Sequence, residues 1–99
     1  AVMKKALPMG SIIDIHQYGR QLLSLKQPKE ALDVFKLNFT KYPNQFTTLM
    51  GLVRGYSGVG DFKNALKYAN LAIPQAPDEQ NKKSVQGMID KLRDGKDVN

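Results

Sequence analysis

The fold is decided by two stretches that repeat after 34 residues, KEALDVFKLNFTKYP at positions 29–43 and KNALKYANLAIPQAP at positions 63–77. In both, an Ala-Leu pair lies twelve residues before a proline, and apolar residues recur at the three- and four-residue intervals of an amphipathic helix. A glycine-containing apolar stretch precedes each copy, at 15–23 and 49–56. The sequence therefore predicts two copies of one helix–turn–helix unit.

Start and stop signals outside these stretches divide the rest of the chain into helices. Ser11 and Asp61 can cap helix N-termini, Pro28 suits a first helical turn, and Gly95 suits a C-terminal cap. No segment alternates apolar and polar residues for long enough to indicate a strand. We expect an all-α protein with helices near 12–25, 28–41, 45–57, 62–74 and 79–94. Their buried stripes are expected to include Ile12, Ile15, Leu22, Val34, Phe35, Leu37, Leu49, Val53, Ala65, Ala69, Val85, Ile89 and Leu92.

The composition is that of one small domain of 99 residues without cysteine. The lack of cysteine excludes disulfides, thiolate metal sites and cysteine nucleophiles, and no apolar run approaches the ~20 residues of a membrane-spanning helix. The net charge of +6 is uneven, because residues 1–45 carry seven basic and three acidic groups whereas residues 46–79 carry three of each. This balance favours acidic partners in general and is weak evidence for nucleic acid.

The two units resemble the tetratricopeptide repeat (TPR) family, and the second unit matches it better. The matching residues of the second unit are Leu49, Leu52, Tyr56, Gly60-Asp61-Phe62, Ala65, Ala69, Ala72 and Pro77; those of the first are Gly19, Leu22, Ala31, Phe35 and Pro43. The first unit departs at Gln27-Pro28, in the turn, and at Asn38, where the family has a small apolar residue. The resemblance implies an α-solenoid with repeats at 12–45 and 46–79, a capping helix at 80–95, an N-terminal segment at 1–11 and a tail at 96–99.

A second resemblance concerns HQYGR at 16–20, ALKYA at 65–69, APD at 76–78 and GKD at 95–97. These motifs are similar to the C-terminal tail of certain exported bacterial proteins that begin with an uncharacterised β-rich domain. The resemblance implies a periplasmic or exported protein, and otherwise a cytoplasmic one is expected. Residues 1–10 would then be the end of a preceding helix or a remnant of an excised fragment.

The TPR resemblance also implies a concave groove lined by the first helix of each unit and by the last helix. The positions that would line it are Ile13, His16, Arg20, Thr47, Met50, Arg54, Asn81, Ser84 and Met88. Positions 13, 16 and 20 share one helix face. Arg20 and Arg54 lie one repeat apart, so their guanidinium groups could receive acidic side chains or a peptide carboxylate. The alternative is that both form local salt bridges or point to solvent.

The chain lacks the residues needed for chaperone-tail clamping, catalysis, metal binding and phosphate binding. Family members that clamp chaperone C-termini use lysines and asparagines where this chain has His16, Arg20, Met50 and Arg54. His16 lacks a nucleophile or an orienting carboxylate on its own face, and it lacks co-ligands for a metal. The glycine-rich segment 55–61 has neither the Lys-Ser/Thr ending nor the preceding strand of a phosphate-binding loop. We therefore expect no catalysis, metal or cofactor.

The resulting functional expectation is a protein–protein interaction module that holds an acidic peptide segment or partner domain in its groove. The alternatives are a basic helical module that binds nucleic acid and a structural or dimerisation tail of a larger protein. Because about three repeats are normally needed for stability, we expect the first helix, with Ile12 and Ile15, to expose apolar surface. That surface would meet residues 1–10, a second copy of the chain or a missing preceding domain.

Overall fold

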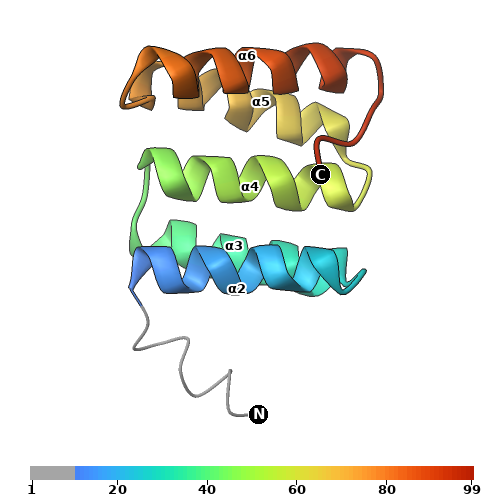
Figure 1. Ribbon diagram of the computed structural model, residues 1–99. Helices are drawn as coiled ribbons and strands as arrows, with labels where there is room; N and C mark the ends of the chain where they lie inside the picture. The colour runs from blue at the N-terminus through green and yellow to red at the C-terminus, as the bar shows by residue number, and fades with distance from the viewer. Residues whose placement is uncertain (1–10) are drawn as a thin grey trace.

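The computed structural model describes residues 11–99, and these form five α-helices in two layers (Figure 1). The helices are α2 (Ile12–Ser24), α3 (Pro28–Lys41), α4 (Phe46–Gly58), α5 (Phe62–Ala72) and α6 (Glu79–Arg93), with a short 3-10 helix, η2 (Ile73–Gln75), after α5. Helices α2, α4 and α6 lie side by side in one layer, and α3 and α5 lie behind them. Two antiparallel helical hairpins and an end helix thus form a short α-solenoid, as the sequence predicted.

Three of the helices, α2, α5 and α6, begin after a residue whose side chain accepts from a free backbone N–H group. Ser11 Oγ accepts from the Asp14 N–H, and the side chain of Asp61 accepts from the Asn64 N–H. Asp78 does the same for Asn81, at a distance of 2.8 Å, and Pro28 occupies the first turn of α3. These contacts confirm the expected starts to within one residue.

The helices end at residues that leave the helical conformation. Lys26, Asn44, Gly60 and Gly95 all have positive φ, of which Gly60, at +84°, and Gly95, at +71°, meet no side-chain penalty. The fourth helix was expected to reach residue 74, but α5 ends at Ala72 and tightens into η2. Pro74 has no N–H to continue the α-helical ladder, which accounts for this difference.

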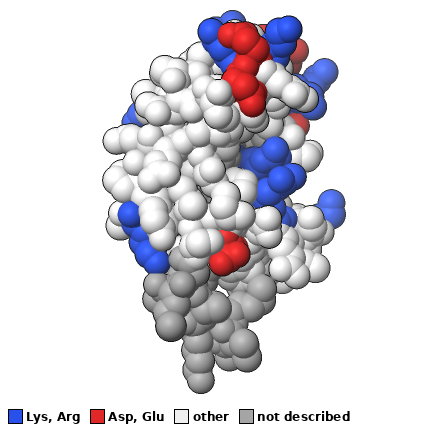
Figure 2. Space-filling model, turned by 60° about the vertical axis from the view of Figure 1, so that its left-hand side comes forward, with Lys and Arg blue, Asp and Glu red and all other residues white. Residues whose placement is uncertain are grey.

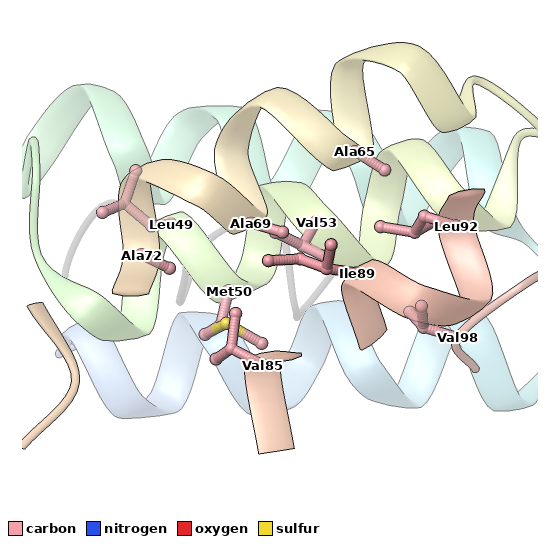
Figure 3. Close-up of a cluster of buried hydrophobic side chains, with 10 residues drawn as sticks. All are labelled: Leu49, Met50, Val53, Ala65, Ala69, Ala72, Val85, Ile89, Leu92 and Val98. Atoms are coloured by element: carbon pink, nitrogen blue, oxygen red, sulfur yellow. The ribbon is translucent and has the colours of Figure 1, made fainter. Parts of the chain in front are cut away.

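Two hydrophobic clusters hold the hairpins together. The first cluster joins α2, α3 and α4, and Phe35 is at its centre with no exposed surface. Gly19 and Gly51 flank this ring so closely that a Cβ atom would lie 2.4 Å and 2.6 Å from its carbons. The second cluster joins α4, α5 and α6 (Figure 3); it comprises Leu49, Met50, Val53, Ala65, Ala69, Ala72, Val85, Ile89, Leu92 and Val98.

Two expectations about the apolar stripes need correction. Leu37 is 38% exposed and belongs to neither hydrophobic cluster of the described residues, so it is not part of the buried stripe of α3. Ile15 was expected to contribute exposed apolar surface, yet it is 1% exposed and belongs to the first cluster, and Ile12 is half-buried. The exposed apolar side chain of α2 is instead Ile13. The predicted N-terminal segment, residues 1–11, lies outside the described residues except for Ser11.

Candidate functional site

The first helix of each hairpin brings His16, Arg20 and Arg54 together on the layer formed by α2, α4 and α6. Arg20 is exposed, and Arg54 and His16 are half-buried. The two arginines are close enough for the charge of Arg20, after burial, to lower the pKa of Arg54. Within residues 11–99 neither arginine forms an ion pair with a carboxylate. Figure 2 shows a group of Lys and Arg side chains near the middle of the molecule, with Asp and Glu side chains above and below it.

His16 supplies a neutral group beside these charges. Burial, together with the positive charges of Arg54 and Arg20, lowers the pKa of His16 from 6.5 to about 4, so the imidazole is uncharged at neutral pH. Its ring centroid lies 5.5 Å from that of Phe35, and its buried Nδ1 has no hydrogen-bond partner among residues 11–99. The group therefore presents two permanent charges and one histidine that takes up a proton only at low pH or beside an anion.

The two arginines line a cavity of about 890 Å³. Polar and charged side chains form most of its wall: Gln17, Arg20, Gln21, Ser24, Lys26, Arg54, Asp97 and Asn99, with Leu23, Pro28 and Gly58 completing it. Such a lining suits a polar, negatively charged segment better than an apolar ligand. Among the described residues, no three His, Cys, Asp or Glu side chains are arranged to hold a metal ion.

The other expected groove residues are more dispersed. Ile13 is 49% exposed on α2, Thr47 is half-buried on α4, and Asn81, Ser84 and Met88 lie on α6 with Ser84 exposed. Met50 needs correction, because it is 8% exposed and packs in the second hydrophobic cluster. The corresponding position of the first repeat is His16, whose ring lies against Phe35. Met50 instead packs with Val85 and Ile89 of the end helix α6.

Sequence reasoning missed Ser57 and the tail, residues 96–99. Ser57 was expected to end the third helix and to belong to the glycine-rich segment 55–61, and it does lie in the last turn of α4, but its burial, at 1% exposed, was not foreseen. Its hydroxyl is bonded to Asp97 and Val98 of the tail. A serine one position before a helix-ending glycine gives no signal of this contact, since the partner is 40 residues away in the chain.

The geometry defines a helical-repeat protein of TPR-like hairpins, and the comparisons with known proteins agree. Tetratricopeptide repeat protein 8 of Mus musculus is 30% identical over 73 residues, and that of Homo sapiens is 32% identical over 73 residues. Each match covers 73% of this chain but only 14% of the relative, so the chain spans about a seventh of the length of these curated relatives. No family model matches the chain, and no solved structure matches it.

Both relatives are mammalian proteins, and their names describe a repeat. The resemblance to exported bacterial proteins gains no support from them and stays a prediction. No helix in the described part of the chain is long and apolar enough to cross a membrane.

Proposed function

We propose that this chain is a non-catalytic protein–protein interaction module whose α2–α4–α6 layer binds a partner segment of acidic character. The observation that carries the proposal is the pair Arg20 and Arg54, which lie one repeat apart and line one cavity, and no carboxylate of residues 11–99 is paired to either. Two such charges held close together repel each other, and an anion between them removes that repulsion.

The binding energy expected from this pair is large enough to measure. A well-made hydrogen bond between arginine and a carboxylate contributes about 1.5–3 kcal/mol, and less where the arginine remains solvated. Since 1.4 kcal/mol corresponds to a tenfold change in Kd, loss of both arginines should weaken a partner by about 10²-fold. Ile13 and Met88 add apolar contact at the two ends of the layer, and methionine adapts to varied side chains.

The test is a fluorescence anisotropy titration with a labelled peptide rich in Asp and Val, and a Lys- and Val-rich peptide as its control. The wild type should bind the acidic peptide alone, and Arg20→Ala combined with Arg54→Ala should reduce binding by about 10²-fold. The matched control, Lys91→Ala with Arg93→Ala, removes the same charge from the last turn of α6. If both double variants lose the same amount of peptide affinity, the effect comes from net charge alone, and the proposal that Arg20 and Arg54 form the binding site is wrong.

A parallel titration with single-stranded and duplex DNA and RNA addresses the alternative function. The basic net charge of +6 would produce some retention at low salt for any anion. Salt-sensitive binding of nucleic acid that is stronger than binding of the acidic peptide would contradict the proposal. Sedimentation of the free chain, compared with that of the peptide complex, tests the dimerisation alternative.

A further inference from the structure

The tail, residues 96–99, returns from the end of α6 and lies across α4 (Figure 1). Its contacts centre on Ser57, whose buried hydroxyl donates to Asp97 Oδ1 at 2.5 Å and accepts from the Val98 N–H at 2.9 Å. One hydroxyl thus binds both the side chain and the backbone of two successive residues.

Asn99 completes this arrangement. Its side-chain amide donates to the carbonyl oxygen of Arg54 at 2.9 Å and to Asp97 Oδ1 at 2.9 Å. Partial burial would raise the pKa of Asp97, but the hydrogen bonds from Ser57, Asn99 and Val98 outweigh it and lower that pKa. The Asp97 carboxylate is therefore ionised at neutral pH and held by hydrogen bonds.

Val98 anchors the tail to the core. Its side chain is 9% exposed and belongs to the second hydrophobic cluster, on the same side of that cluster as Leu92 (Figure 3). One aliphatic side chain and a few hydrogen bonds hold a segment that has no regular secondary structure. Segments with so few buried contacts open at a small fraction of the free energy of global unfolding.

The tail also shares the cavity of the proposed function. Asp97 and Asn99 line the same 890 Å³ space as Arg20 and Arg54. An ionised Asp97 on that wall opposes the entry of a second carboxylate. Release of the tail would remove this charge, enlarge the cavity and free the hydroxyl of Ser57.

We propose that the surface of α4 around Ser57, which here binds Asp97 and Val98 of the tail, is a peptide-binding slot that the tail blocks. A partner displaces the tail with an extended segment in which an aliphatic residue follows an acidic one. The proposal rests on the proposed function and names the partner's chemistry: its carboxylate accepts from Ser57, its next N–H donates to Ser57, and its aliphatic side chain replaces Val98. The apparent Kd of the partner is then its intrinsic Kd divided by the fraction of molecules in which the tail is released.

The experiment follows tail and peptide separately in the full chain. In ¹⁵N-labelled protein the Val98 amide should exchange more slowly than a random-coil amide but faster than the amides of the core helices. The Asp- and Val-rich peptide should move its resonance to a random-coil position at the concentration at which anisotropy reports binding. Val98→Ser should bind the peptide about five- to tenfold more tightly, because the tail loses its buried aliphatic group. Val59→Ser, the same change at an exposed residue in the α4–α5 turn, should bind as the wild type does.

Two further variants keep the test sharp. Asn99→Ala loosens the tail without altering the core, and should tighten binding in the same direction if Val98→Ser fails to fold. Ser57→Ala releases the tail but removes the slot's hydroxyl, so its affinity should not exceed that of the wild type. If the peptide binds in a way that depends on Arg20 and Arg54 but the Val98 amide resonance does not shift, the inference about the tail is wrong and the proposed function stands. Absence of peptide binding in the wild type and in all variants would reject the proposed function and this inference with it.

Discussion

At the scale of the residue, His16 makes the stability of the fold depend on pH. Its folded-state pKa of about 4 lies below the ordinary value of 6.5, so the unfolded chain binds more protons between these values. The stabilisation is present above pH 6.5 and is lost as the pH falls towards 4. Between pH 7 and pH 5 this should lower the free energy of unfolding by about 1–2 kcal/mol, after allowance for the partial exposure of the ring.

Urea denaturation of the wild type and of His16→Gln at the two pH values measures this term. The glutamine variant should lose less stability than the wild type on acidification, because the group that must stay neutral is gone. Equal pH dependence in the two proteins would show that His16 takes up its proton without cost. Addition of the acidic peptide should raise the pKa of His16, which ¹H NMR of the imidazole can follow.

Residue-level features divide into those that the sequence could predict and those that it could not. The caps at Ser11 and Asp61 depend on neighbours three residues away, so local sequence was sufficient. Met50 is buried by α6, and Ser57 is buried by the tail; both covering segments are distant in the chain. Helical periodicity assigns a residue to a face of its own helix, but it does not say which other segment covers that face.

At the scale of the element, small residues set how closely α2, α3 and α4 approach one another. Gly19→Ala would place a Cβ 2.4 Å from the Phe35 ring, and we expect a loss of about 1–3 kcal/mol. Gly87→Ala is the matched control on α6, where a Cβ meets nothing within 4 Å. Alanine there should stabilise the helix by about 0.5–1 kcal/mol. Thermal denaturation should show a lower Tm for Gly19→Ala and a higher Tm for Gly87→Ala. A Gly19→Ala protein as stable as the wild type would contradict this account.

The start of α5 offers a second test at this scale. The carboxylate of Asp61 accepts from the Asn64 N–H at 3.2 Å and from its side-chain amide at 2.7 Å. Asp61→Ala should lower the free energy of unfolding by about 1 kcal/mol, since a helix start loses its cap. Asp90→Ala, at an exposed position inside α6, removes the same charge without a cap. If the two variants are equally stable in urea, capping does not define this boundary.

At the scale of the whole molecule, the repeated sequence predicted the order of the helices but not how the two hydrophobic clusters are joined. Phe39, Tyr56 and Tyr68 pack against both clusters. The rings of Tyr56 and Tyr68 are stacked with centroids 5.6 Å apart, and Phe39 meets Tyr68 edge-on at 6.0 Å. These contacts come from α3, α4 and α5, so they couple the first hairpin to the second.

This coupling predicts that the solenoid unfolds as one unit. Far-UV circular dichroism and tyrosine fluorescence should give coincident urea transitions in the wild type, because neither cluster can lose its partner without losing the shared aromatic rings. Tyr68→Ala should lower the free energy of unfolding by about 2–4 kcal/mol, whereas Tyr42→Ala, at a half-buried ring outside both clusters, should cost less. Two separated transitions in the wild type would mean that each hairpin is stable alone, as in a longer repeat array with weak interfaces, and that the aromatic contacts contribute packing without coupling.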